Sequence, residues 1–246
     1  MTKISKSSRS LWIASCCLSV AMGLVMESRA AEIALPAEAK RAEALANAVE
    51  SYRAKFTLET KEKGGENFRV EGTILFKRPN RRRLELHQRA AGSAELAEDL
   101  SQTLVSDGTT EWQYYPKDQV VYKAATAPLA PGPHRPFSEI KPETLRFVEQ
   151  VGNDPDVRLR FEGSPTLSIT DGAPVPIKTL RVDVGQADGL VRELALLDEK
   201  GEAVLTQKYE DLEINPSIGD DAFNFTPPEG VSVMDVGAQG PGKPAQ

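Results

Sequence analysis

Apolar and polar residues alternate with a period of two along most of the chain after residue 54. In residues 68–86 (FRVEGTILFKRPNRRRLEL) and 102–123 (QTLVSDGTTEWQYYPKDQVVYK), short alternating runs are separated by turn signals at 78–80 and 107–108. Runs of this kind predict antiparallel strands with one apolar face. Similar runs predict further strands at 54–60, 157–162, 177–184, 190–197 and 203–214, and an extended segment at 221–233.

Two segments have helical spacing instead. Residues 36–53 place alanines, Leu45 and Val49 on one shallow apolar stripe, and residues 142–151 place Leu145, Phe147 and Val148 at helical spacing. The proline-rich segment 125–136 between the strands predicts an extended connector. Two or three helices are too few to cover both faces of the sheet. The predicted fold is therefore mainly β: one strongly curved antiparallel sheet, an incomplete barrel, with the helices on its concave side.

The alternation also predicts which side chains face inward. A slip of one residue would bury charged side chains, so Arg69, Glu71, Lys77, Glu85 and Glu111 are expected to face water. The opposite set forms the candidate ligand-binding surface: Phe56, Leu58, Phe68, Val70, Ile74, Phe76, Leu84, Leu86, Trp112 and Tyr114.

The N-terminus has the pattern of a secretory signal. Basic residues precede an apolar run at 11–26, and Ser28-Arg29-Ala30 is a small-x-small cleavage site. The expected domains are a cleaved signal peptide at 1–30, a single domain at 31–236 and a disordered tail at 237–246. This organisation predicts a soluble periplasmic protein. The alternative is a lipobox at 13–16, which would anchor the chain through a lipid on Cys16.

Composition narrows the chemistry. Both cysteines, Cys16 and Cys17, lie in the signal, so the mature chain would have neither thiol nor disulfide. Removal of the signal leaves 26 basic and 35 acidic residues, and this acidic balance argues against nucleic acid as a partner. His87 and His134 stand apart from any metal or hydrolase motif. We therefore expect no catalytic residue, no metal site and no cofactor.

Three blocks of sequence point to a family: EGTILFKRPNRRRLEL at 71–86, LVSDGTTEWQYYPKDQVVY at 104–122 and FNFTPPEGVSVMD at 223–235. They resemble the periplasmic lipoprotein carrier superfamily (LolA-like), which also holds the outer-membrane lipoprotein receptor and RseB-type stress sensors. The resemblance implies a curved, incomplete barrel with a helical lid over an apolar cavity that carries acyl chains. It also implies a role for Arg78, which precedes the proline of the Arg-Pro motif and would bond to lid backbone until cargo enters.

The chain departs from the family pattern at two places. An aromatic residue usually follows Arg-Pro-Asn in the family, whereas this chain has Arg81-Arg82-Arg83-Leu84, and residues 90–100 resemble an insertion. The arginine run is either the solvated start of a strand or a site for lipid phosphate or another anion.

The first functional hypothesis is a monomeric carrier of lipoprotein acyl chains or other lipids, served by membrane-bound loading and receiving proteins. The alternative is a non-enzymatic structural or sensor protein of the envelope that uses the same sheet to bind a partner protein.

Overall fold

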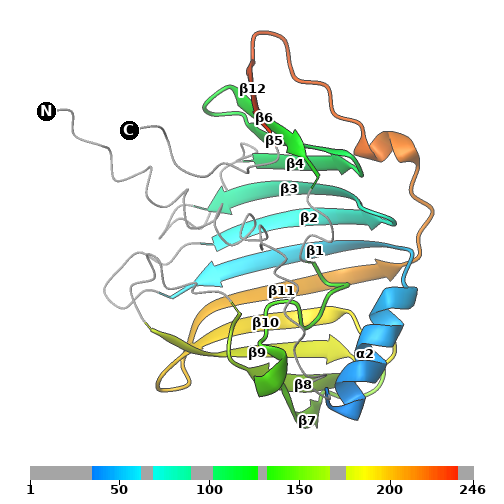
Figure 1. The fold of residues 1–246 in the computed structure, drawn as a ribbon, viewed down its shortest axis with the longest axis vertical. Coiled ribbons are helices and arrows are strands. Elements are labelled where there is room, and N and C mark those ends of the chain that lie inside the picture. Colours follow the sequence, from blue (N-terminus) through cyan, green and yellow to red (C-terminus); the bar gives the residue numbers. More distant parts are fainter. Residues whose placement is uncertain (1–34, 62–68, 90–101, 127–131, 167–175, 238–246) are drawn as a thin grey trace, which may run out of the picture.

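The computed structural model describes residues 35–61, 69–89, 102–126, 132–166 and 176–237. They form one open sheet of twelve strands in the order β12-β6-β5-β4-β3-β2-β1-β11-β10-β9-β8-β7, with one α-helix and two short 3-10 helices (Figure 1). The expected N-terminal signal, the start of the domain and the tail after residue 237 lie outside the described residues. The elements are α2 (Ala37–Ala48), β1 (Ser51–Thr60), β2 (Arg69–Lys77), β3 (Arg81–Arg89), β4 (Gln102–Asp107), β5 (Thr110–Tyr115), β6 (Val120–Ala125), η1 (Pro142–Thr144), β7 (Arg146–Val151), β8 (Arg158–Gly163), β9 (Ile177–Gly185), β10 (Val191–Asp198), β11 (Ala203–Ile214), η2 (Asp220–Phe223) and β12 (Ser232–Gly237).

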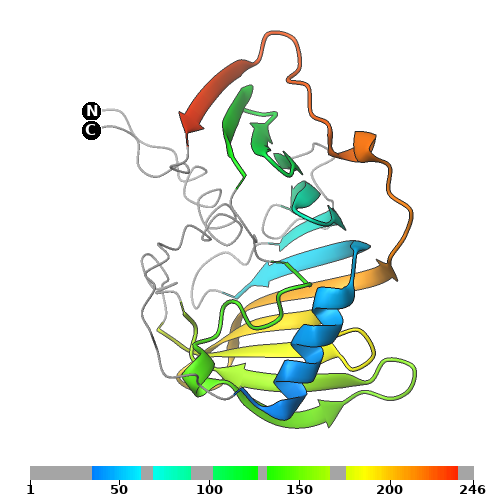
Figure 2. The same ribbon diagram turned by 45° about the vertical axis from the view of Figure 1, so that its right-hand side comes forward.

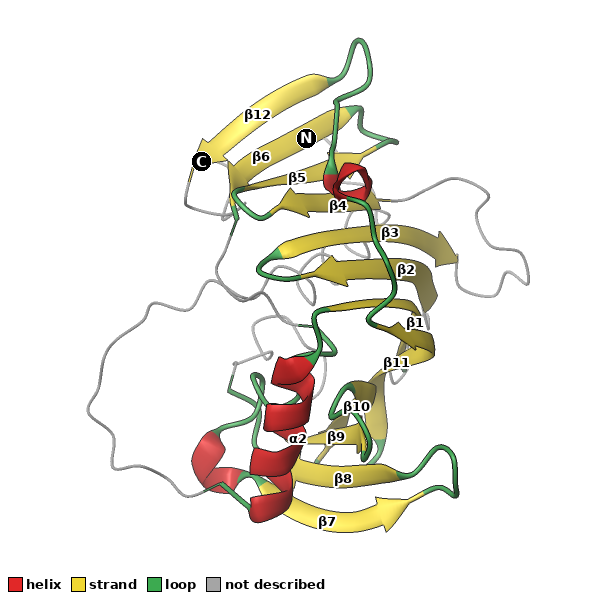
Figure 3. Cartoon of the chain, turned by 90° about the vertical axis from the view of Figure 1, so that its right-hand side faces the viewer, coloured by secondary structure: helices red, strands yellow, loops and turns green. Residues whose placement is uncertain are grey.

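The prediction of a mainly β fold with an unclosed sheet is confirmed, but the sheet is not wholly antiparallel. Strand β12 pairs with β6 in parallel, with Val233 opposite Val121. After β11 the chain leaves the middle of the sheet and runs to its far edge, where it joins β6 (Figure 3). A long connection of this kind allows a parallel pair, which a tight hairpin cannot form.

The strand registers define one face that carries most of the buried apolar side chains. Phe56 lies opposite Gly72, Leu58 opposite Val70, and Ile74 opposite Leu84, so these side chains share a face across β1, β2 and β3. We call this side of the sheet the covered face and the other side the far face. Phe68 lies outside the described residues. The inward orientation is confirmed for seven predicted residues, which are all buried in one cluster: Phe56, Leu58, Val70, Ile74, Phe76, Leu84 and Leu86.

Helix α2 packs on the covered face with its alanines. The helix lies across one side of the sheet (Figure 2). Ala39, Ala42 and Ala46 are fully buried and belong to the same cluster as the sheet residues. The helix ends at Ala48, five residues before the predicted end, because the chain from Ser51 onward pairs with two strands. Tyr52 lies opposite Phe76 of β2 and Ile214 of β11, and a helix there would lose both ladders.

The predicted helix at 142–151 is wrong. Residues Pro142–Thr144 form the 3-10 helix η1, and Arg146–Val151 form the edge strand β7, which pairs with β8. Three apolar residues cannot distinguish a short helix from an edge strand. Hydrogen bonding to β8 holds this backbone in the extended conformation. Phe147 packs edge-on against Phe161 with ring centroids 5.6 Å apart. The described residues thus contain one α-helix rather than two or three.

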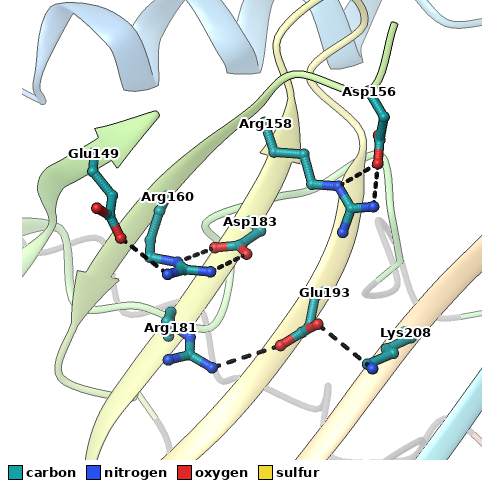
Figure 4. A network of polar contacts seen from close by, with 8 residues as sticks. All are labelled: Glu149, Asp156, Arg158, Arg160, Arg181, Asp183, Glu193 and Lys208. Atoms are coloured by element: carbon teal, nitrogen blue, oxygen red, sulfur yellow. Dashed lines mark hydrogen bonds and ion pairs between the residues drawn. The ribbon is translucent and has the colours of Figure 1, made fainter. Parts of the chain in front are cut away.

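The far face of β7 to β11 carries a network of ion pairs (Figure 4). Arg160 donates two hydrogen bonds of 2.8 Å to the carboxylate of Asp183 and one of 3.0 Å to Glu149. The hydrogen bond from Arg160 to Asp183 is the main cause that raises the pKa of the guanidinium. Glu193 lies between Arg181 and Lys208. This charged surface confirms that the apolar positions of these strands face the other way.

Candidate functional site

Two segments lie over the covered face: helix α2 and residues 132–145. We call them together the cover. In the second segment, Phe137 and Ile140 are buried, and Phe137 packs edge-on against Phe161 at 4.7 Å. The backbone N–H of Val191 donates to the carbonyl of Pro133 at 2.9 Å, which ties this segment to the sheet. The apolar surface of the sheet is therefore shielded from water by the cover.

Arg78 joins the sheet to the helix of the cover. It follows the last residue of β2, and its Nε donates to the carbonyl of Val49 at 2.8 Å while Nη2 donates to the carbonyl of Ala46 at 3.4 Å. These carbonyls lie at the C-terminal end of α2, where the carbonyl of Ala46 also accepts from the N–H of Val49 at 3.3 Å and where a cation is favoured by the helix dipole. The hydrogen bonds expected from the family resemblance are thus present, and their opening by a ligand remains a proposal.

His134 is a residue of the cover that packs against the sheet. Its ring stacks on Phe76 at 4.0 Å with an interplanar angle of 19°, and its Nδ1 shares a 3.1 Å hydrogen bond with the hydroxyl of Tyr52. Burial lowers the pKa of His134 to about 3, and repulsion by Arg78 and Arg135 adds to the effect. The imidazole is therefore neutral at physiological pH. The sequence placed His134 in the proline-rich connector and gave no signal of this contact.

This buried histidine predicts how stability depends on pH. The pKa of His134 is lower in the folded chain than the ordinary value of about 6.5 in the unfolded chain, so the unfolded chain binds the extra proton between those values. Its contribution is complete above about pH 6.5 and falls by about 1.4 kcal/mol per unit as the pH decreases toward 3. Urea unfolding at pH 7.5, 6 and 5 should show this loss in the wild type and a shallower slope in His134→Phe. His87→Phe should keep the wild-type slope, and equal slopes for all three proteins would contradict the assignment.

Trp112 and Tyr114 do not join the covered face, contrary to the prediction. Leu104, which faces the cover, lies opposite Gln113, so the neighbouring aromatic residues of β5 point to the far face. There they are half-buried beneath Phe225, whose ring centroid lies 6.3 Å from Trp112 and 6.1 Å from Tyr114. The C-terminal segment that carries Phe225 therefore packs against these two rings on the face opposite the predicted binding surface.

The covered face changes from apolar to polar between β3 and β5. Glu111 was expected to face water but is buried, because the guanidinium of Arg82 lies against its carboxylate. Gln113 is also buried and donates to Glu111 at 3.0 Å. A buried carboxylate is tolerated only with such partners, which explains the orientation of β5. The sequence signal for it was the central arginine of 81–83, whose alternation places Arg82 on the same face as Leu84.

Two cavities formed by described residues lie away from the predicted binding surface. One of about 500 Å³ is lined mainly by charged residues of the far face, among them Arg53, Lys55 and Glu213. The other, of about 170 Å³, lies at the ends of β1 and β11 near Lys61 and Ala203. Neither contains Arg78 or the buried phenylalanines.

Two further observations concern metal-binding groups and helix length within the described part of the chain. No group of three or more histidine, cysteine, aspartate or glutamate side chains is placed to hold a metal ion there. Among the described helices, none has the length and apolar character needed to cross a membrane.

No family model matches the chain, and no curated protein matches it either. Among solved structures, it is similar to an uncharacterized conserved protein from Thermus thermophilus, with 14% identity, a TM-score of 0.52 and coverage of 80% of this chain and 96% of that chain. A chain of the Pseudomonas aeruginosa MucA/MucB complex matches at 16% identity and a TM-score of 0.45, over 77% of this chain and 60% of that chain. A LolA superfamily protein from Nitrosomonas europaea matches at 10% identity and a TM-score of 0.34, over 76% of this chain and 96% of that chain.

At these identities the likeness to the solved structures concerns the fold alone. The TM-score of 0.52 shows that this chain shares its fold with the Thermus protein.

Proposed function

We propose that this protein is a periplasmic carrier that binds the acyl chains of lipoproteins or other lipids between the covered face and the cover. The observation that carries the proposal is Arg78. Its guanidinium fastens the end of α2 to the sheet directly beside a continuous apolar surface. A few hydrogen bonds of this kind hold the cover closed and leave it able to open.

The apolar surface suits an acyl chain. Each methylene removed from water contributes about 0.8 kcal/mol, so a long chain needs an apolar wall rather than many polar contacts. Phe56, Ile74 and Phe76 form part of an apolar wall, and the alanines of α2 belong to the same buried cluster. Alanine side chains contribute little burial compared with leucine or phenylalanine, so an acyl chain replaces them at low cost.

Replacing Arg78 with leucine should preserve folding and slow the release of cargo. The empty protein regains the hydrogen bonds from Arg78 to Ala46 and Val49 when the cover closes, whereas the variant does not. Hydrogen bonds from a charged donor contribute about 1.5–3 kcal/mol, so the variant should hold an acyl ligand about 10- to 150-fold more tightly. Transfer of a fluorescent palmitoylated peptide from the protein to phosphatidylcholine vesicles measures this directly.

Two further variants make the experiment specific. Arg78→Lys should be intermediate, because an ammonium group lacks the planar fork of guanidinium. Arg83→Leu is the matched control, since Arg83 lies on the far face and bonds to Glu85 at 2.8 Å. Equal release rates for wild type and Arg78→Leu would reduce Arg78 to a residue that only caps the helix. Failure of the wild type to bind the acyl peptide would refute the carrier function itself.

A second candidate function is partner binding, in which the chain acts as a structural or sensor protein of the envelope. Both edge strands favour it, because among the described residues each has a neighbouring strand on one side only and carries exposed apolar side chains: Phe147 and Val148 on β7, and Val233 and Met234 on β12. An exposed edge can accept a further strand from another chain. Native mass spectrometry of the purified protein distinguishes the two: bound lipid or lipopeptide supports the carrier, whereas a ligand-free protein supports the partner-binding module.

A further inference from the structure

The arginine run at 81–83 is divided between the two faces of β3. Arg81 pairs with Asp220 and Arg83 pairs with Glu85, both on the far face. Arg82 points to the covered face, where its side chain is 14% exposed and pairs with Glu111. Two of the three arginines are thus half-buried in ion pairs on the far face, and the third lies beside the apolar wall, largely shielded from water.

Arg82 has an unused donor. Its Nε is buried and has no hydrogen-bond partner among the described residues. Buried polar groups in folded proteins are nearly always hydrogen-bonded, and an unpaired donor on a charged group is especially unfavourable. A residue kept in this state at the edge of a proposed binding surface indicates an acceptor that is supplied by the ligand.

The surroundings of Arg82 define the kind of acceptor. The carboxylate of Glu111 neutralises its charge, and Gln113 donates to the same carboxylate. Further along this face, Gln102 donates to the hydroxyl of Tyr115 at 3.1 Å. The polar patch therefore combines one balanced ion pair with neutral amide and hydroxyl groups. An anion would be repelled by Glu111, whereas a neutral carbonyl oxygen could accept from Arg82 without disturbing the pair.

Position connects this patch to the apolar wall. Arg82 lies opposite Phe76 in the register of β2 and β3, and Leu84 follows on the same face. An acyl chain that lies along Phe76 and Leu84 would place its first carbonyl group near Arg82. The distance between neighbouring strands, about 4.8 Å, is similar to the length of a few methylene groups.

We propose that Arg82, held by Glu111, recognises the ester or amide carbonyl that joins an acyl chain to its head. This inference rests on the proposed carrier function and names the group by which the cargo is positioned. The carbonyl oxygen accepts a hydrogen bond from Nε of Arg82, and the tail lies along the apolar wall. The site then distinguishes acylated molecules from other apolar compounds of the same length.

The test compares two ligands with matched tails, dipalmitoylglycerol and its diether analogue dihexadecylglycerol, which lacks both carbonyls. The wild type should bind the diester about tenfold more tightly, the effect of one hydrogen bond to a charged donor. Arg82→Gln/Glu111→Gln should lose this preference while its affinity for the diether stays unchanged. Arg83→Gln/Glu85→Gln, the matched ion pair on the far face, should keep the preference.

Three results would overturn the inference. Equal binding of the diester and the diether by wild type would leave the carrier function standing and remove the carbonyl site. Binding of neither ligand would refute the carrier function and the inference together. Dipalmitoyl phosphatidic acid bound more than about tenfold tighter than the diester would show a phosphate site instead. Should the double variant fail to fold, Arg82→Lys keeps a cation beside Glu111 without the Nε donor, and it should also lose the preference for the ester.

Discussion

Replacing Gly189 with alanine should lower the free energy of unfolding by about 3 kcal/mol and loosen α2 from the sheet. Gly189 has φ +70°, and a Cβ built there would overlap the carbonyl oxygen of Ala42 and lie 2.9 Å from the backbone nitrogen of Ala46. A left-handed conformation costs a residue with a side chain about 1–2 kcal/mol. The remainder comes from moving helix backbone that cannot rotate away. Urea unfolding measures the loss, and faster proteolysis within residues 37–48 would report the freed helix.

Gly201 provides the matched control for that experiment. Its φ is +80°, but a Cβ there would meet nothing within 4 Å. Gly201→Ala should therefore show only the conformational cost, about 1 kcal/mol, with unchanged proteolysis of the helix. Equal losses at the two positions would mean that the contact between Gly189 and α2 does not determine how the cover is seated. A larger loss at Gly189, accompanied by tighter binding of an acyl ligand, would connect helix packing to cover opening.

Most of the sheet could be predicted from the sequence because each strand carries its own signal. Strand β11, Ala203–Ile214, begins and ends at the predicted residues. Alternation over several residues and a turn at each end leave little freedom for a different assignment. The segment at 142–151 was predicted wrongly because its pattern is short and its structure is set by pairing with β8, a contact distant in sequence.

The candidate site was predictable only where its residues belong to the apolar alternation. Phe76 and Ile74 follow from that pattern, and Arg78 follows from the family resemblance. The inward turn of Glu111 could not be predicted from β5 alone, since Trp112 and Tyr114 make the opposite register look more apolar. Two long-range contacts decide it: Arg82 from β3 on one face and the C-terminal segment on the other.

The ion pair between Arg82 and Glu111 on the covered face, called here the inner ion pair, should be among the positions where a substitution destabilises the protein most. Arg82→Gln alone should destabilise it by about 3 kcal/mol, because the buried carboxylate of Glu111 then loses its cation. Arg82→Gln/Glu111→Gln should recover much of that loss, since no uncompensated charge remains. Urea unfolding of the wild type, both single variants and the double variant completes a cycle, with an expected coupling energy of about 2 kcal/mol.

The pair formed by Arg83 and Glu85 calibrates this cycle on the same strand. Its side chains are 30% and 38% exposed, against 14% and 11% for Arg82 and Glu111. An exposed pair contributes only about 0–1 kcal/mol, so its coupling should be well below that of the inner pair. Similar coupling in both cycles would show that water reaches Glu111 freely. A large coupling energy confined to the inner pair would show that the covered face holds a balanced ion pair in an environment poor in water. In such an environment, a single unpaired donor on Arg82 can select a carbonyl oxygen.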